Sequence, residues 1–136
     1  KGESDQYSTV DLCTVNLYDG EAELYKIGAA TGFLKREKEV MEFHVDSLPV
    51  GVENNLKIDH KKMQLKNGDF IVMVTDGVLE YLHVPKPEET MQEILESIDT
   101  NHPGILAKKA MERVLLFTGG KVPDDMTILA AGIREK

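Results

Sequence analysis

The chain has 136 residues, of which 41% are hydrophobic and 29% are charged. This composition is ordinary for one soluble globular domain and excludes a disordered chain, and no stretch approaches the roughly 20 apolar residues of a membrane-spanning helix. The net charge of −8 argues against a nucleic-acid partner, because phosphate backbones select positive surfaces. It is compatible with divalent metals or basic partners. A single cysteine excludes an internal disulfide framework and fits a reducing compartment.

Alternating apolar and polar residues predict strands through the first half of the chain. In the run Thr9–Tyr18, for example, Cys13, Val15 and Leu17 alternate with polar or amphipathic neighbours. Further strands are predicted at Glu21–Ile27, Gly32–Lys35, Val40–Val45, Ile58–Leu65 and Phe70–Val74. The polar-rich run Ile58–Leu65 is expected at an edge of a sheet. Phe70–Val74 is apolar on both faces and is expected at the centre of a sheet.

Two dipeptides predict tight turns between these strands. Asp19-Gly20 and Asn67-Gly68 each stand between two predicted strands. Type I′ turns need positive φ at both central residues, and Asp-Gly and Asn-Gly are typical of them. The sequence therefore predicts two-residue hairpins at both places.

The second half of the chain is predicted to be helical. Apolar residues at helical spacing predict one helix that opens after Pro87 and a second that runs from about Asn101 to Phe117. The buried faces are expected to hold Met91, Ile94, Leu95 and Ile98 in the first helix, and Leu106, Ala110, Val114 and Phe117 in the second. A final apolar run, Met126–Ile133, predicts a buried strand. Runs of strands followed by helices indicate an α+β fold, and a sandwich with helices over one face would cover the most apolar strands.

Two groups of carboxylates are candidates for chemistry. Asp76-Gly77 directly follows the predicted central strand, and Asp124-Asp125 precedes the last one. Neighbouring carboxylates repel each other unless a bound cation neutralises their charge. Carboxylate oxygens are hard ligands, which Mg²⁺ and Mn²⁺ prefer. The spacing alone favours a structural role, in which Asp76 caps a short turn over Gly77–Tyr81 and Asp124 begins a turn, because Asp is common at caps and turns.

The other reactive side chains form no comparable pattern. Cys13 alternates with apolar residues and is expected to be a buried small hydrophobe, and the four histidines lack metal-ligand spacing. Lys35, Arg36 and Lys38 form a small basic patch. Such a patch is usually a solvated face, although a phosphorylated partner could use it.

Two of these segments resemble the metal motifs of a known enzyme family. FIVMVTDGVLE (Phe70–Glu80) resembles the strand followed by Ser/Thr-Asp-Gly of the metal-dependent protein serine/threonine phosphatases of the phosphatase 2C type. PDDMTILAAGI (Pro123–Ile133) resembles their closing Asp-Asp/Asn motif and last strand. The upstream blocks Tyr7–Arg36 and Ser47–Val52 are similar to the bacterial sporulation and stress-response branch of that family.

The resemblance implies a fold and a set of site residues. The fold is part of a phosphatase 2C-like β-sandwich flanked by helices, and the complete domain holds two ions, Mn²⁺ or Mg²⁺. By position, Asp76 and Asp124 match the catalytic metal-binding aspartates. Asp125 stands where relatives often have Asn, and Gly77 is the permissive neighbour, so both are kept in the predicted metal site. Hydrolysis by water explains why no protein nucleophile is needed.

One expected motif is absent from the sequence. The early Asp-Gly-x-Gly motif of the family, which carries a bridging aspartate, is not found before Tyr7, and Asp19-Gly20 is in the wrong place. The chain is therefore interpreted as a single partial phosphatase 2C-like domain over residues 1–136, without the N-terminal portion. Self-association is expected, because sheet faces that the absent portion would cover are left exposed and favour association with another chain.

Two functions are left open by these observations. In the first, which the resemblance implies, the protein removes phosphate from a phosphoserine anti-anti-sigma factor in sporulation sigma-factor control. The parent protein is then expected at the cytoplasmic face of the cell membrane, although this segment has no anchor. In the second, the segment is a non-catalytic binding or dimerisation module, inactive in isolation.

Overall fold

The computed structural model describes residues 9–44, 59–117, 119 and 125–136. It comprises two compact units, each built from two stretches of the chain, and each is described by itself. The first unit takes residues up to Ala29 and then Val45–Leu65. The second takes Ala30–His44 and Lys66–Lys136. Across the described residues, no helix is both long and apolar enough to cross a membrane.

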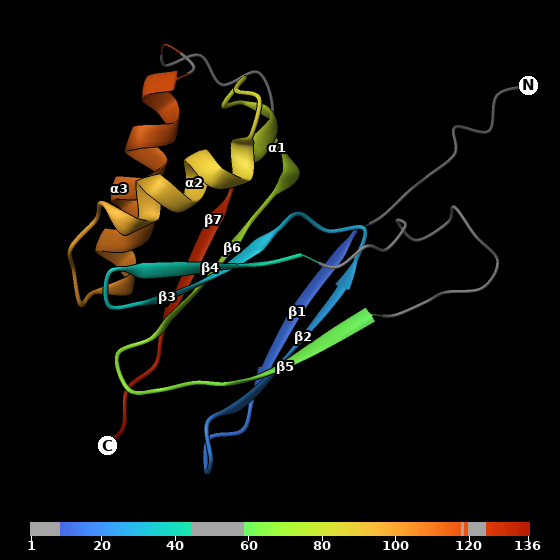
Figure 1. The fold of residues 1–136 in the computed structure, drawn as a ribbon, viewed down its shortest axis with the longest axis vertical. Coiled ribbons are helices and arrows are strands. Elements are labelled where there is room, and N and C mark those ends of the chain that lie inside the picture. Colours follow the sequence, from blue (N-terminus) through green and yellow to red (C-terminus); the bar gives the residue numbers. More distant parts are fainter. Residues whose placement is uncertain (1–8, 45–58, 118, 120–124) are drawn as a thin grey trace, which may run out of the picture. The chain divides into compact units, whose positions relative to one another are not determined.

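The first unit is a three-stranded antiparallel sheet (Figure 1). Its strands are β1 (Val10–Val15), β2 (Glu21–Ile27) and β5 (Asp59–Gln64), with β2 in the middle. The edge position predicted for the polar strand β5 is confirmed. On β2, the alternating side chains of Ala22, Leu24 and Lys26 are buried, as a strand with one covered face requires.

The loop between β1 and β2 is longer than predicted. The hairpin exists, but it is closed by the five residues 16–20 instead of a two-residue turn at Asp19-Gly20. Only Gly20 in this loop has a positive φ, of 73°. The Asn16 and Asp19 side chains accept the backbone N–H groups of Tyr18 and Glu21, each at 2.9 Å. These side-chain bonds compete with continued strand pairing, which is why β1 ends early.

The second unit is a four-stranded antiparallel sheet with three helices. In spatial order its strands are β4 (Glu39–Phe43), β3 (Gly32–Arg36), β6 (Phe70–Val74) and β7 (Ile128–Gly132). The interior position predicted for β6 is confirmed. The helices are α1 (Asp76–Glu80), α2 (Pro87–Glu96) and α3 (Pro103–Phe117). With the two antiparallel sheets, they confirm the α+β class.

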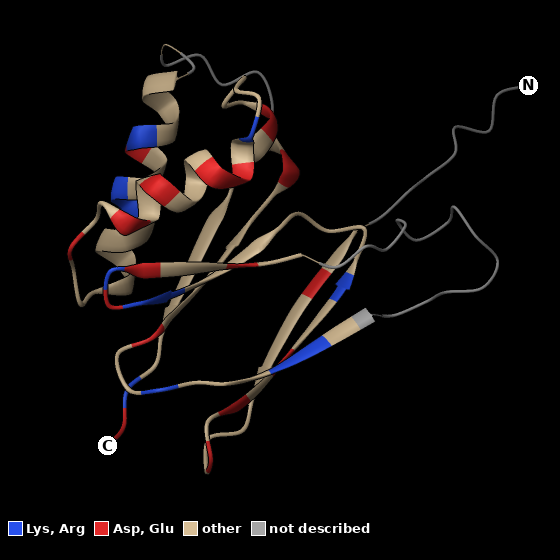
Figure 2. Cartoon of the chain, in the orientation of Figure 1, with Lys and Arg blue, Asp and Glu red and all other residues tan. Residues whose placement is uncertain are grey.

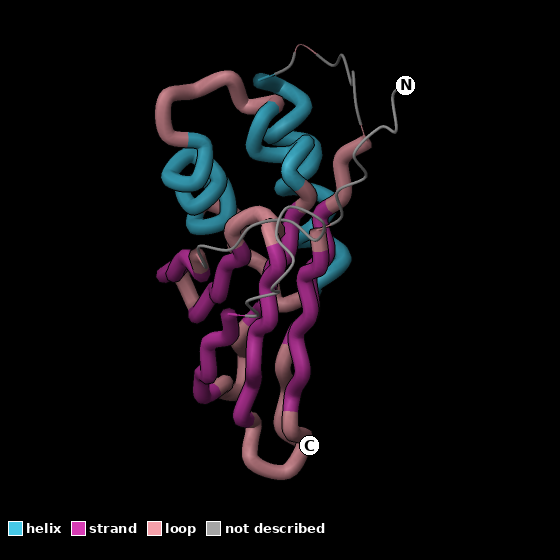
Figure 3. Tube along the Cα trace, turned by 90° about the vertical axis from the view of Figure 1, so that its right-hand side faces the viewer, coloured by secondary structure: helices cyan, strands magenta, loops and turns pink. Residues whose placement is uncertain are grey.

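The core of the second unit lies between this sheet and the helices, which gather on one side of it (Figure 3). Phe33 and Val72 from the sheet are fully buried, as are Leu95 of α2 and Leu106 of α3. The predicted apolar faces of both helices are confirmed except at Phe117, whose side chain is 49% exposed at the end of α3. The opposite side of α2 is acid-rich (Figure 2), with Glu88 and Glu89 in its first turn, where the helix dipole favours negative charge.

Two further predictions about the sheet need correction. The last strand, β7, begins at Ile128 and is only half buried, because it lies at the edge of the sheet, where Leu129 is 52% exposed. Asn67-Gly68 is a turn but joins no hairpin, because β5 and β6 belong to different sheets. Asp69 N donates to Lys66 O, and Gly68 has φ of 92°, as in a type II turn.

Candidate metal centre

The candidate site lies where β6 ends and β7 begins. These strands are antiparallel neighbours, with Val74 opposite Ile128 in the register. Asp76 follows β6 after one residue, and Asp125 precedes β7 by three residues. The end of one antiparallel strand and the start of its neighbour meet at the same edge of a sheet. The fold therefore brings together two carboxylate-bearing segments that are far apart in the sequence.

Gly77 allows a close approach of these two segments. A Cβ atom built at Gly77 would lie 2.5 Å from the carbonyl oxygen of Asp125, so no other residue fits there without a shift of the backbone. Gly77 is buried, while the side chains of Asp76 and Asp125 are exposed. The glycine thus allows close approach of the two chains and leaves the carboxylates accessible to a ligand.

The structure excludes one of the two roles open for Asp76. The residue that caps α1 is Thr75, with φ −80° and ψ 157°, and Asp76 is the first residue inside the helix. The interpretation of Asp76 as the cap of a short turn is therefore wrong. The turn over Gly77–Tyr81 is itself a short helix, closed by the Tyr81 N–H, which donates to Gly77 O at 3.1 Å.

The predicted metal-site residues are brought together in part. Asp76, Gly77 and Asp125 meet at the strand ends, whereas Asp124 lies outside the described residues. In the part of the chain that is described, no three His, Cys, Asp or Glu side chains lie close enough together to hold a metal ion. The exposed carboxylates of Asp76 and Asp125 are compatible with a hard divalent cation. Metal binding by these four residues stays a prediction.

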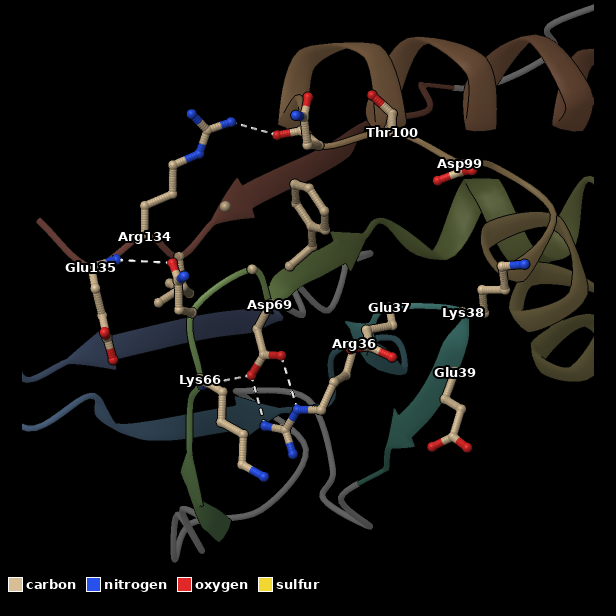
Figure 4. Close-up of a pocket in the computed structure, with 16 residues that line it drawn as sticks. Arg36, Glu37, Lys38, Glu39, Lys66, Asp69, Asp99, Thr100, Arg134 and Glu135 are labelled. Carbon is tan, nitrogen blue, oxygen red and sulfur yellow. Dashed lines mark hydrogen bonds and ion pairs between the residues drawn. The ribbon is translucent and has the colours of Figure 1, made fainter.

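A pocket lies at the opposite end of the same sheet, and it contains an ion pair that the sequence did not predict (Figure 4). Arg36 Nη2 lies 2.7 Å from Asp69 Oδ2, and Arg36 Nε donates to Asp69 Oδ1 at 2.9 Å. The Lys66 backbone N–H also donates to Asp69 Oδ2, at 2.8 Å. Burial alone would raise the pKa of Asp69, but these hydrogen bonds and the Arg36 charge hold it below its ordinary value.

This ion pair divides the predicted basic patch. Arg36 is engaged by Asp69, and Lys35 is buried in the second unit, with Lys38 exposed. Burial lowers the pKa of Lys35, against the opposing charges of Asp99 and Glu96. The three cations therefore do not present one surface to a phosphorylated partner.

Cys13 is less buried than predicted. It is partly buried, and burial together with the neighbouring Asp11 carboxylate raises the pKa of its thiol, against the charge of Lys26. A raised pKa keeps the thiol protonated and unreactive near neutral pH. Cys13 is therefore no candidate nucleophile.

The fold is that of a phosphatase 2C-like domain. Among solved structures, the chain is similar to the phosphatase domain of SpoIIE from Bacillus subtilis (Mn presoaked), with a TM-score of 0.83 and 30% identity over 95% of this chain and 58% of that one. It is also similar to the PP2C phosphatase domain and regulatory-domain fragment of the same protein, with a TM-score of 0.87 and 32% identity over 92% of this chain and 37% of that one. The PstP/Ppp phosphatase of Mycobacterium tuberculosis, at 18% identity and a TM-score of 0.58, shares the fold.

The chain belongs to the stage II sporulation protein E (SpoIIE) family, whose model matches residues 1–134. It is 34% identical to stage II sporulation protein E of Bacillus subtilis over 128 residues and 33% identical to that of Priestia megaterium over 129 residues. These matches cover 93% and 94% of this chain but only 16% and 22% of the relatives. The resemblance to the sporulation branch of the phosphatases is thereby confirmed.

Proposed function

We propose that this chain is part of a metal-dependent protein serine/threonine phosphatase. The observation that carries the proposal is the contact of Gly77 with the Asp125 backbone, which brings the two aspartate-bearing motifs together at one edge of the sheet. The similarity to SpoIIE phosphatase domains supports the same activity. Since the chain spans less than a quarter of the curated relatives, the proposal concerns the whole protein and not the segment alone.

Asp76 and Asp124 are the proposed catalytic metal ligands, with Asp125 and Gly77 beside them. Mn²⁺ or Mg²⁺, two ions in the complete domain, would lower the pKa of water and neutralise phosphoryl oxygens when bound. The protein's own part is to hold the Asp76 carboxylate at the solvent-exposed start of α1. Gly77 keeps the backbone before β7 close to it.

The proposed substrate is a phosphoserine on an anti-anti-sigma factor, in sporulation sigma-factor control. Membership of the SpoIIE family and the sporulation-type sequence blocks support this substrate class. We further propose that the parent protein acts at the cytoplasmic face of the membrane and associates with itself. These proposals rest on the family and not on a contact in this chain.

The test uses the full-length protein and a phosphoserine anti-anti-sigma factor. Phosphate release is measured with and without Mn²⁺ for the wild type, for Asp76→Asn and for Glu80→Gln. The last variant is the matched control, because Glu80 is an exposed carboxylate at the other end of α1. We expect Mn²⁺-dependent release in the wild type and the control, and loss of at least about 100-fold in Asp76→Asn, comparable to the removal of a group that stabilises transition-state charge.

Each contrary result has its own meaning. Normal turnover by Asp76→Asn would remove Asp76 from the site. Metal-independent release would overturn the metal-dependent mechanism. No release by the wild type at all would favour the alternative, a non-catalytic binding or dimerisation module, whose stability should then not respond to Mn²⁺ beyond an ionic-strength effect.

A further inference from the structure

Thr75 joins the end of β6 to the start of β7 through its side chain. The Thr75 N–H donates to the carbonyl oxygen of Thr127 at 3.1 Å. In return, the Thr127 N–H donates to Thr75 Oγ1 at 2.9 Å, and this hydroxyl also lies 3.5 Å from Thr127 O. The two residues thus exchange hydrogen bonds as the last rung of the β6–β7 ladder, one position beyond Val74 and Ile128.

The side chain is needed because the backbone carbonyl of Thr75 has another partner. In a regular antiparallel pair, Thr127 N–H would donate to Thr75 O. That oxygen instead accepts the N–H of Val78, at 3.0 Å, in the first turn of α1. The hydroxyl of Thr75 makes no capping bond to α1, since it is directed across to β7. The Thr75 hydroxyl therefore accepts the Thr127 N–H in place of the Thr75 carbonyl, which accepts the Val78 N–H of α1. Through Thr75, the last rung of the β6–β7 ladder and the first turn of α1 are directly connected.

This arrangement lies between the two predicted metal motifs. Asp76 follows Thr75 directly, and Asp125 stands two residues before Thr127. A hydroxyl that fixes the distance between Thr75 and Thr127 also fixes how closely the two aspartate-bearing segments approach each other. The two segments are already so close at Gly77 and Asp125 O that a Cβ atom does not fit between them.

We propose that Thr75 is a positioning residue, whose hydroxyl sets the separation of Asp76 from Asp125 and so determines the affinity for the divalent metal. This role rests on the proposed function of the site. Thr75 binds neither metal nor substrate itself and acts through the backbone of Thr127. A valine at position 75 would keep the shape of the side chain but leave the Thr127 N–H without its acceptor, whereas a serine would keep the hydrogen bond.

The experiment compares Thr75→Val, Thr75→Ser and Thr14→Val in the full-length protein. Thr14→Val is the control, because it makes the same change at an exposed position of β1. The Kd for Mn²⁺ is measured by titration calorimetry, and kcat is measured at saturating Mn²⁺. We expect Thr75→Val to weaken Mn²⁺ binding by roughly 10–100-fold, as loss of a group that orients metal ligands does. We expect kcat at saturating metal to change much less, and Thr75→Ser and Thr14→Val to behave like the wild type.

A second measurement protects the test against a variant that does not fold. Hydrogen exchange of the wild-type protein, followed by mass spectrometry, reports on the Thr127 amide, which should exchange slowly if the hydroxyl holds it. Fast exchange there, or unchanged Mn²⁺ affinity in folded Thr75→Val, would overturn the role of Thr75 alone. Absence of Mn²⁺ binding by the wild type would overturn the proposed function and this role with it.

Discussion

At the scale of single residues, Gly77 has the strictest spatial requirement in the candidate site. The carbonyl oxygen of Asp125 occupies the space that any side chain at position 77 would enter. A carbonyl is part of the backbone and cannot rotate away as a flexible side chain can. Substitution at this position must therefore move either the start of α1 or the segment before β7.

We predict that Gly77→Ala destabilises the protein by about 1–3 kcal/mol, as overpacking commonly does. It should also weaken Mn²⁺ binding, because the two aspartate-bearing segments are forced apart. Gly104→Ala is the matched control: its Cβ would meet the exposed His102 ring at 3.3 Å, and alanine is favoured over glycine in α3. Thermal unfolding and calorimetry measure both effects, and equal behaviour of the two variants would contradict the steric argument.

Asp69 has a different role, because it stabilises the fold at a distance from the metal motifs. Its carboxylate is 1% exposed and is held by Arg36 and by the backbone of Lys66. Its own backbone oxygen accepts the Ile133 N–H at 2.8 Å. One residue thus joins β3, the turn before β6 and the segment after β7.

The lowered pKa of Asp69 predicts a dependence of stability on acid. The pKa of Asp69 in the folded protein lies below its ordinary value of 3.8. The ionised Asp69 therefore contributes its full share to the free energy of unfolding above pH 3.8, and this share is lost as the pH falls through the folded pKa. The free energy of unfolding of the wild type should exceed that of Asp69→Asn at pH 7, and the difference should shrink below about pH 4. Urea unfolding across this range is the measurement. Glu112→Gln, an exposed acid on α3, is the control and should show no such pH-dependent difference.

At the scale of elements, hydrophobic periodicity predicted where the helices and strands lie, but not how they end. The apolar spacing of α2 and α3 is a local property of the sequence and places the core face correctly. Element ends depend on hydrogen bonds that periodicity does not contain. Asn16 and Asp19 lengthen the first loop, and the Thr75 hydroxyl adds one more rung to the pairing of β6 with β7.

Two leucines on α3 test the assignment of its faces. Leu106 is fully buried, and Leu116 is 80% exposed on the same helix. We predict that Leu106→Ala lowers the free energy of unfolding by about 2–5 kcal/mol, because it leaves a cavity in the core. Leu116→Ala should change it by less than about 0.5 kcal/mol. Chemical unfolding of both variants measures the contrast, and similar losses would mean that α3 packs differently.

At the scale of the whole molecule, the sequence predicted the α+β class, because its runs of strands come before its runs of helices. It could not predict the pairing of Arg36 with Asp69, which are 33 residues apart and have no shared pattern. It also could not assign β5 and β6 to different sheets, since a short polar connection with Asn-Gly is equally typical of a hairpin. Both features, the Arg36–Asp69 ion pair and the separation of β5 from β6, depend on contacts between distant parts of the chain and not on local propensity.

The order of the strands along the chain has a consequence for synthesis. Every described strand of the first unit has been synthesised once Gln64 is added, so its sheet can form before the second one is complete. The other sheet receives its interior strand, β6, later and its last strand, β7, only at the very end of this segment. Closing that long interval has an entropic cost, which the final contacts must offset. The edge that carries Asp76 and Asp125 is therefore assembled last, and a nascent chain that stops before Ile128 has no such site.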